Sequence, residues 1–216
     1  MSKPFLLLLL IAAASLNAAS QSGRKIIPRP MQTPPVQLPV NAEPEPRPAS
    51  APPAKLTFLP ETLRERQIKA LNSGSFRFAD FTGKVVVINL WASWCGPCRR
   101  EIPEYEKVRK AFAGRDVEFI GLTTEDPRAS SDRVNKFLRD VSFGFRLGWA
   151  DRETAHTLMN GRGGIPQTLV IDGDGHIVNH WIGYAPGTSG DRLRLAIDQA
   201  LETVAKAQSG RVVYPR

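Results

Sequence analysis

Short apolar runs alternate with amphipathic, charge-rich segments through the middle of the chain. The runs Lys84–Leu90 and Val117–Thr124 hold consecutive apolar residues, which predicts strands buried on both faces. Between them, the segment from Cys95 to about Ala113 has helical character, and Pro97 falls where the first turn of a helix tolerates proline. This order predicts a strand, a short turn and a helix that leads into the next strand.

A second pattern, two strand-like segments around a tight turn, follows nearer the C-terminus. Ile165–Ile171 carries a proline at its beginning, a position where strands tolerate it. The glycine-rich turn Asp172–Gly175 joins it to His176–Ile182, which predicts a β-hairpin. Regular alternation along the second strand would place Ile177 and Trp181 on the same face.

Weaker patterns mark the remaining elements and complete an alternating order. They are a helix over Glu61–Leu71, a strand over Ser75–Phe81, a helix over Asp132–Val141 capped by Ser130 or Ser131, a strand or loop over Ser142–Ala150, a short helix over Thr154–Met159, and a final amphipathic helix from Ser189 or Asp191 to about Ala207. Strands and helices alternate first, and a hairpin then precedes the last helix. The pattern predicts an α/β fold with one central mixed β-sheet flanked by helices.

The N-terminal segment differs in composition from the rest of the chain. Residues 1–19 combine Lys3, a short apolar core and small residues around Ala18 and Ala19, which predicts a signal peptide and export into a periplasm-like space. The apolar core is shorter than the roughly 20 residues of a stable membrane-spanning helix. An uncleaved N-terminal anchor is the alternative.

A proline-rich stretch separates this segment from the predicted domain. Of the 18 prolines in the chain, eleven lie between Pro28 and Pro60. Residues 20–54 hold too few large apolar side chains to build a core, so we predict a disordered, partly extended linker. A docking ligand for a proline-binding module is the alternative. The folded domain is expected over residues 55–208, followed by a tail over residues 209–216.

The basic composition adds little to this prediction. The net charge is +8 and the isoelectric point is near 9.9, values that permit attraction to nucleic acid or anionic membranes. The lysines and arginines are scattered, however, and aromatic residues do not alternate with them. We therefore predict no nucleic-acid binding.

The candidate chemistry lies in the two cysteines, Cys95 and Cys98, which are the only ones in the chain. At the start of a helix, unpaired backbone N–H groups and the helix dipole stabilise a thiolate, so the pKa of a thiol there falls from about 8.5 toward 7 or below. We expect Cys95 to be the exposed nucleophile. Cys98, one turn further along, would resolve the mixed disulfide.

Three alternatives compete with redox activity. A zinc site would need two more ligands, and the chain has no second cysteine pair. A purely structural disulfide would close a very short loop and stabilise the fold little. The third alternative is an inactive relic of a redox site, and we favour redox activity over all three.

These motifs together resemble a known family. WASWCGPC after VVVINL, GIPQT some 70 residues later, and the DGDG hairpin with its following helix resemble the thioredoxin fold. The sequence CRREIP and the predicted signal peptide resemble the exported branch related to TlpA and ResA. The resemblance covers about Phe76 to Ala207.

The resemblance implies roles for individual residues. Cys95 corresponds to the attacking cysteine of the family and Cys98 to the resolving one. Pro166 corresponds to a cis-proline beside the disulfide, and an ordinary trans proline at the start of a strand is the alternative. The residues expected to form the substrate groove are Trp94, Gly96, Pro97 and Ile165.

Two further positions distinguish branches of the family. Asn89 stands where cytoplasmic thioredoxins carry a buried aspartate that helps to deprotonate the second cysteine. Glu101 matches an acidic residue that ResA-like proteins keep near the cysteines, and it shares a helix face with Cys98 at i, i+3. The resemblance implies that Glu101 tunes Cys98 or carries its proton. A solvated helix charge is the alternative.

The expected function is that of an exported thiol–disulfide oxidoreductase without metal or organic cofactor. The resemblance implies cysteine-containing protein substrates, a membrane thiol protein as electron donor, and a reducing role in cytochrome c maturation or in repair of other cysteine proteins. An oxidant that forms disulfides is one alternative. A copper-handling module is another, and it would need a histidine (His156, His176 or His180) near Cys95. A peroxidase role is disfavoured by the sequence context of the cysteines.

Overall fold

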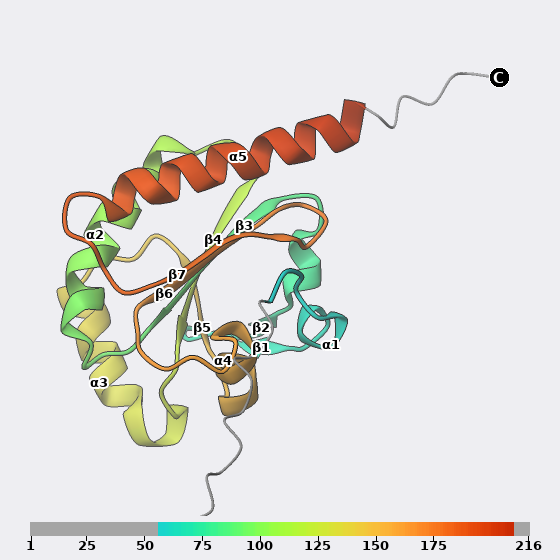
Figure 1. The fold of residues 1–216 in the computed structure, drawn as a ribbon. Helices are drawn as coiled ribbons and strands as arrows, with labels where there is room; N and C mark the ends of the chain where they lie inside the picture. The colour runs from blue at the N-terminus through green and yellow to red at the C-terminus, as the bar shows by residue number, and fades with distance from the viewer. Residues whose placement is uncertain (1–55, 210–216) are drawn as a thin grey trace, which may run out of the picture. The chain divides into compact units, whose positions relative to one another are not determined.

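The structure is a computed structural model that describes residues 56–209. A single mixed sheet forms its centre, with helices on both faces (Figure 1). The predicted signal peptide and proline-rich linker, and all but the first residue of the predicted tail, lie outside the described residues. None of the helices described is long and apolar enough to cross a membrane.

The main sheet has five strands in the order β5-β4-β3-β6-β7. Its central strand, β3 (Val85–Trp91), pairs in parallel with β4 (Val117–Thr123) and antiparallel with β6 (Gln167–Ile171). At the edges, β5 (Arg146–Trp149) continues the parallel part and β7 (Ile177–Ile182) the antiparallel part. The mixed sheet expected from the sequence is therefore confirmed, and the Ser142–Ala150 segment contains a strand.

The hydrophobic content of β3 explains its central position. All seven of its residues are buried. Val86, Ile88 and Leu90 enter one hydrophobic core, whereas Val85 and Val87 enter another on the opposite face. A strand with apolar side chains on both faces is stable only when other elements cover both of them.

Helices supply this cover. Leu63 of α1 and Leu158 of α4 pack into the first core, and Tyr105 of α2 and Leu193 of α5 pack into the second. The helices are α1 (Glu61–Arg64), α2 (Gly96–Ala111), α3 (Pro127–Asp140), α4 (Arg152–Leu158) and α5 (Ser189–Ser209), and a 3-10 helix, η1 (Phe78–Phe81), precedes β3.

The N-terminal part of the domain differs from the sequence prediction. The helix expected over Glu61–Leu71 ends at Arg64, because the next residues form a small hairpin, β1 (Ile68–Lys69) with β2 (Ser75–Phe76). The strand expected over Ser75–Phe81 is only two residues long and gives way to η1. Phe78 and Phe81 are both buried, and a 3-10 helix places residues three apart on one side.

Helix α3 begins earlier than expected. Asp126 caps it, since its carboxylate accepts hydrogen bonds from the backbone N–H groups of Arg128 (2.8 Å) and Ala129 (3.2 Å). Pro127 occupies the first turn, where a missing N–H costs nothing. The capping role predicted for Ser130 or Ser131 is wrong, because both lie inside the helix and Ser131 donates its hydroxyl hydrogen bond to the carbonyl of Pro127.

The second strand of the hairpin also departs from regular alternation. Ile177 packs into the core that contains Ile88, whereas Trp181 packs into the core that contains Val87 on the other face. The register shifts by one residue beside Ile171. A β-bulge of this kind moves the following side chains to the opposite face, so the shared face predicted for Ile177 and Trp181 is wrong.

Replacing the helix cap tests the start of α3. Asp126→Ala removes the acceptor of two backbone N–H groups and should lower the free energy of unfolding by about 0.5–2 kcal/mol. Ser131→Ala is the control and should change it by less than about 0.5 kcal/mol, because its hydroxyl bonds a carbonyl one turn back. Guanidinium unfolding curves measure both, and equal losses in the two variants would contradict the assignment.

Candidate redox site

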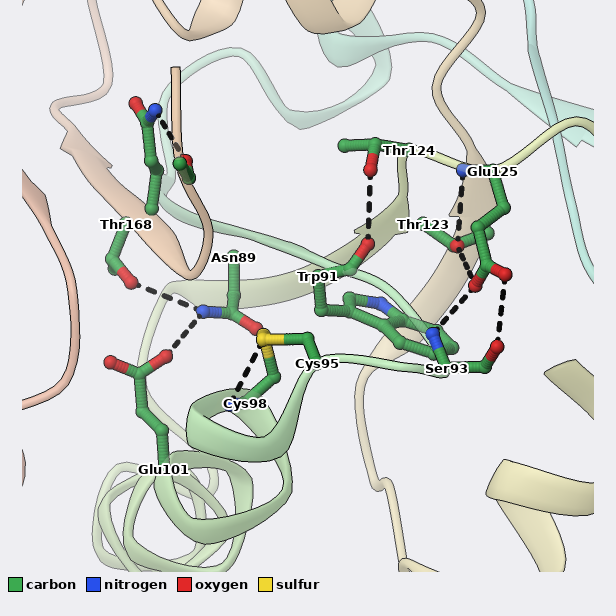
Figure 2. Close-up of a disulfide and its surroundings, with 12 residues drawn as sticks. Asn89, Trp91, Ser93, Cys95, Cys98, Glu101, Thr123, Thr124, Glu125 and Thr168 are labelled. Atoms are coloured by element: carbon green, nitrogen blue, oxygen red, sulfur yellow. Dashed lines mark hydrogen bonds between the residues drawn. A yellow bond between two sulfur atoms is a disulfide. The ribbon is translucent and has the colours of Figure 1, made fainter. Parts of the chain in front are cut away.

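The two cysteines lie where β3 gives way to α2 and are joined as a disulfide (Figure 2). Cys95 has extended backbone angles and occupies the N-cap position of α2. Its sulfur accepts a hydrogen bond of 3.1 Å from the backbone N–H of Cys98. A cap is usually an oxygen-bearing side chain. Here sulfur takes that place, so a thiolate at Cys95 would receive the hydrogen bond and the positive end of the helix dipole.

Access to the disulfide comes from one side. Cys98 is completely buried and Cys95 is 4% exposed. Cys95 is therefore the more accessible of the two, as predicted, but it is not the exposed residue that we expected. Trp94 is 68% exposed, and Gly96 and Pro97 are exposed as well. The residues on either side of Cys95 thus form an exposed edge, Trp94–Pro97, beside the disulfide.

Pro166 lies at the same edge of the sheet. The Ile165–Pro166 peptide bond is cis, which the resemblance implied. Because β6 runs antiparallel to β3 and Gln167 pairs with Leu90, Pro166 stands one residue beyond the last pair, at the end of β3 that leads to the cysteines. Ile165 is half-buried and packs against the cluster that contains Cys95 and Cys98.

A buried polar network extends inward from the disulfide. The amide nitrogen of Asn89 donates to the carboxylate of Glu101 (2.9 Å) and to the hydroxyl of Thr168 (3.1 Å). Tyr105 accepts at its hydroxyl from Thr168 (3.3 Å) and from the indole N–H of Trp181 (3.1 Å). All five residues are buried. Figure 2 shows Asn89 between Glu101 and the disulfide.

Glu101 is an unusual carboxyl group. It is completely buried, so the alternative of a solvated helix charge is wrong. Burial raises the pKa of Glu101 to about 7, against the opposing effects of Asn89 and Tyr105. Among the described residues no group donates to its second oxygen, Oε1, or to Asn89 Oδ1. A carboxyl group that gains and loses a proton near neutral pH, on the helix face that carries Cys98, is suited to proton transfer.

A second buried carboxyl group, missed in the sequence, lies on the other side of the disulfide. Glu125 accepts hydrogen bonds from the backbone N–H (2.6 Å) and the hydroxyl (2.9 Å) of Ser93, which precedes Trp94. In sequence, Glu125 is only an acidic residue after a predicted strand. Only the order of the strands could have indicated this contact, because the carboxyl ends of the parallel strands β3 and β4 meet at one edge of the sheet.

Two of the three histidines that a copper site could use make other contacts, and the third, His156, lies on α4. His176 packs against Phe58 and lies beside Asp172, and His180 contacts Gln167 and Arg162. Within residues 56–209 no group of three or more His, Cys, Asp or Glu side chains is arranged to hold a metal ion.

An open pocket of about 690 Å³ adjoins the site. Its wall includes Glu125, the first turn of α3, residues of α4 and the glycine-rich loop Gly161–Gly163 that leads to Pro166. The pocket therefore lies beside Glu125 and the loop before Pro166, and neither cysteine is among its lining residues.

The fold and the cysteine pair define a thioredoxin-fold protein with a redox-type site. The chain belongs to the AhpC/TSA family, whose model matches residues 57–180. It is 29% identical over 107 residues to the thiol-disulfide oxidoreductase ResA of Geobacillus thermodenitrificans, a match that covers 50% of this chain and 59% of the relative.

Other relatives agree with this placement. The thiol:disulfide interchange protein HelX of Rhodobacter capsulatus is 34% identical over 102 residues, which cover 47% of this chain and 53% of HelX. The chain thus spans between half and three fifths of these relatives. A thiol:disulfide interchange protein of the thioredoxin family from Chlorobium tepidum has a solved structure that superposes with a TM-score of 0.57 at 25% identity, over 68% of this chain and 98% of the other.

The raised pKa of Glu101 predicts a pH-dependent stability. Because the folded-state pKa of about 7 exceeds the unfolded value near 4.5, the folded protein binds more protons between these values. The free energy of unfolding should fall as pH rises through this window, by about 1.4 kcal/mol per unit of pKa difference, and level off above it.

Glu101→Gln removes this titration while keeping the shape of the side chain. The variant should lose that part of the pH dependence and be the more stable protein at pH 8. Denaturant unfolding of the oxidised wild type and variant across the window from 4.5 to 7 measures the difference. Parallel stability curves for the two proteins would show that Glu101 titrates outside it.

Proposed function

We propose that this chain is an exported thiol–disulfide oxidoreductase that reduces disulfides of protein substrates. The observation that carries the proposal is the Cys95–Cys98 disulfide at the start of α2, with the Cys98 N–H directed at the sulfur of Cys95. A sulfur held in this way is stabilised as a thiolate after reduction, and the thiolate is the reacting species in disulfide exchange.

The proposed reaction begins with the reduced protein. The Cys95 thiolate attacks one sulfur of the substrate disulfide, forms a mixed disulfide and releases the other substrate sulfur as a thiolate. Cys98 then loses its proton and attacks the Cys95 sulfur, which closes the Cys95–Cys98 disulfide and releases the second substrate thiolate. The protein loses two electrons and the substrate gains them. Glu101, close to Cys98 on the buried face of α2, is the proposed acceptor of the Cys98 proton.

The reducing direction rests on the sequence, whereas the relatives support thiol–disulfide exchange in general. Gly96-Pro97 between the cysteines and Ile165 before Pro166 resemble reducing members of the thioredoxin fold. ResA and HelX are described as a thiol-disulfide oxidoreductase and a thiol:disulfide interchange protein. An oxidised pair must be reduced again, and the proposed donor is a membrane thiol protein.

The proposed location and pathway follow from the N-terminal sequence and the resemblance. The predicted signal peptide over residues 1–19 supports a periplasmic location, with membrane anchoring if the segment is not cleaved. Cysteine-containing proteins are the proposed substrates, and cytochrome c maturation is the proposed pathway.

Cys98→Ser should trap the substrate. Without the resolving thiol, the mixed disulfide between Cys95 and the partner accumulates and is seen as a species that disappears on reduction, in non-reducing gels of the exporting host. Cys95→Ser with Cys98 intact is the matched control and should trap little, because Cys98 is completely buried. A Cys98→Ser protein without any cysteine-linked partner would contradict the two-cysteine mechanism.

The reduction potential of the cysteine pair decides the direction. Equilibration with glutathione or dithiothreitol should give a value near about −270 mV, as for a reductant that needs a dedicated donor. A value near about −120 mV would instead make the protein a disulfide-forming oxidant.

A further inference from the structure

The loop before Cys95 is held by a buried carboxylate that the proposed reaction does not use. We propose that Glu125 is a positioning residue that fixes this loop through Ser93 and sets the stability of the Cys95 thiolate through its negative charge, which Arg133 partly offsets. The inference deepens the proposed function and rests on it, because the charge matters for catalysis only if Cys95 is the attacking thiol.

The contacts of Glu125 fix the loop at two points. One carboxylate oxygen accepts from the backbone N–H of Ser93 at 2.6 Å, and the other accepts from its hydroxyl at 2.9 Å. The hydroxyl of Thr123 on β4 adds a third hydrogen bond at 3.3 Å. Figure 2 shows these contacts beside the loop that leads from Trp91 to Cys95. The end of β4 is thereby connected to the residue two positions before the nucleophile.

The charge of Glu125 is only partly compensated. Its side chain is 5% exposed, and its three hydrogen-bond donors are neutral groups. The nearest cation is the guanidinium of Arg133 on α3, at 3.7 Å, whose side chain is 63% exposed and also bonds Ser130. Solvent weakens the field of an exposed charge more than that of a buried one. The ion pair therefore leaves part of the negative potential of Glu125 uncompensated on this side of the site.

This potential opposes the effect of the helix. The N-terminus of α2 stabilises the Cys95 thiolate, whereas a nearby carboxylate destabilises it and raises the pKa of the thiol. A less stable thiolate makes the dithiol a stronger reductant. Other charged groups lie in the same elements. They include Arg99, Arg100 and Glu101 in the first turns of α2, Asp126 at the N-cap of α3, Asp140 at the end of α3, which pairs with Arg99, and Arg162 in the loop before β6.

Two substitutions should shift the pKa of Cys95 in opposite directions. Glu125→Gln keeps an acceptor for Ser93 but removes the charge, so it should lower the pKa of Cys95 and move the equilibrium with glutathione toward the reduced protein by about three- to tenfold. Arg133→Gln removes the partner cation, so it should raise the pKa of Cys95 and move that equilibrium the other way by a smaller factor. High salt should reduce the Arg133→Gln effect more than the Glu125→Gln effect.

Glu118 offers a matched control on the same strand. It is a carboxylate of β4 that accepts from Arg146 at 2.7 Å, at the end of the strand remote from the cysteines. Glu118→Gln removes one charge of the same kind and should leave both the pKa of Cys95 and the glutathione equilibrium unchanged.

Ser93→Ala keeps the charge of Glu125 but removes one of its two contacts with the loop. It should slow mixed-disulfide formation at a matched thiolate fraction while the pKa of Cys95 stays near the wild-type value.

The pKa of Cys95 is measured by the ultraviolet absorbance of the thiolate in a Cys98→Ser background, where it is the only cysteine. The glutathione equilibrium is measured on the intact pair by alkylation and mass spectrometry, with thermal unfolding to verify the fold of each variant. Opposite shifts in Glu125→Gln and Arg133→Gln, absent in Glu118→Gln, are the expected result. Shifts of the same sign in the first two, or no shift in either, would overturn the inference.

The two proposals fail in different ways. A wild-type pair that does not exchange with glutathione would overturn the proposed function. The thiolate titration of Cys95 would still show whether Glu125 and Arg133 act on it with opposite sign.

Discussion

The geometry of the cysteine pair centres on one hydrogen bond, from the backbone N–H of Cys98 to the sulfur of Cys95. This bond exists only because β3 ends and α2 begins within a few residues, with Cys95 at the cap position. A strand buried on both faces fixes where the helix starts, and the helix directs its free N–H groups and its dipole at the sulfur. The sheet therefore acts on the chemistry by placing a helix terminus, and the cysteine side chain itself completes the cap.

Two buried carboxyl groups lie near this helix terminus, which stabilises negative charge on sulfur. Glu101 lies inward of the disulfide and has a pKa raised to about 7 by burial, so near neutral pH it can take up a proton. Glu125 lies on the side of the Ser93 loop and is held by three hydrogen-bond donors and a guanidinium. One group is placed to exchange a proton with Cys98, and the other is placed to bias Cys95. In the proposed mechanism, the helix terminus stabilises the Cys95 thiolate, Glu125 opposes that effect, and Glu101 takes up the proton of Cys98.

Patterns among residues close in sequence predicted most of the fold. The features that were not predicted depend on contacts between distant segments. The apolar runs that form β3 and β4 and the CGPC sequence at the start of α2 were readable because each depends on residues close in sequence. The bulge that separates Ile177 from Trp181, and the 3-10 helix that buries Phe78 and Phe81, depend on tertiary packing. Ser93 and Glu125 lie 32 positions apart and meet only through the pairing of β3 with β4. No periodicity in the chain reports such a contact.

The identity of residue 89 follows from the same electrostatic balance. Asn89 is buried on β3 opposite Thr168 and donates to the carboxylate of Glu101. An aspartate there would place a second acid against Glu101, and two buried carboxyl groups in contact cannot both ionise, so one proton would be shared between them. An amide avoids this coupling because it is neutral at every pH and supplies a donor. Glu101 is then the only titrating group of the Asn89, Thr168 and Tyr105 network near neutral pH, since the pKa of Tyr105 is raised far above its ordinary value by burial. An asparagine at position 89 is therefore compatible with a titrating carboxyl group on α2, to which we assign the proton transfer in the proposed mechanism.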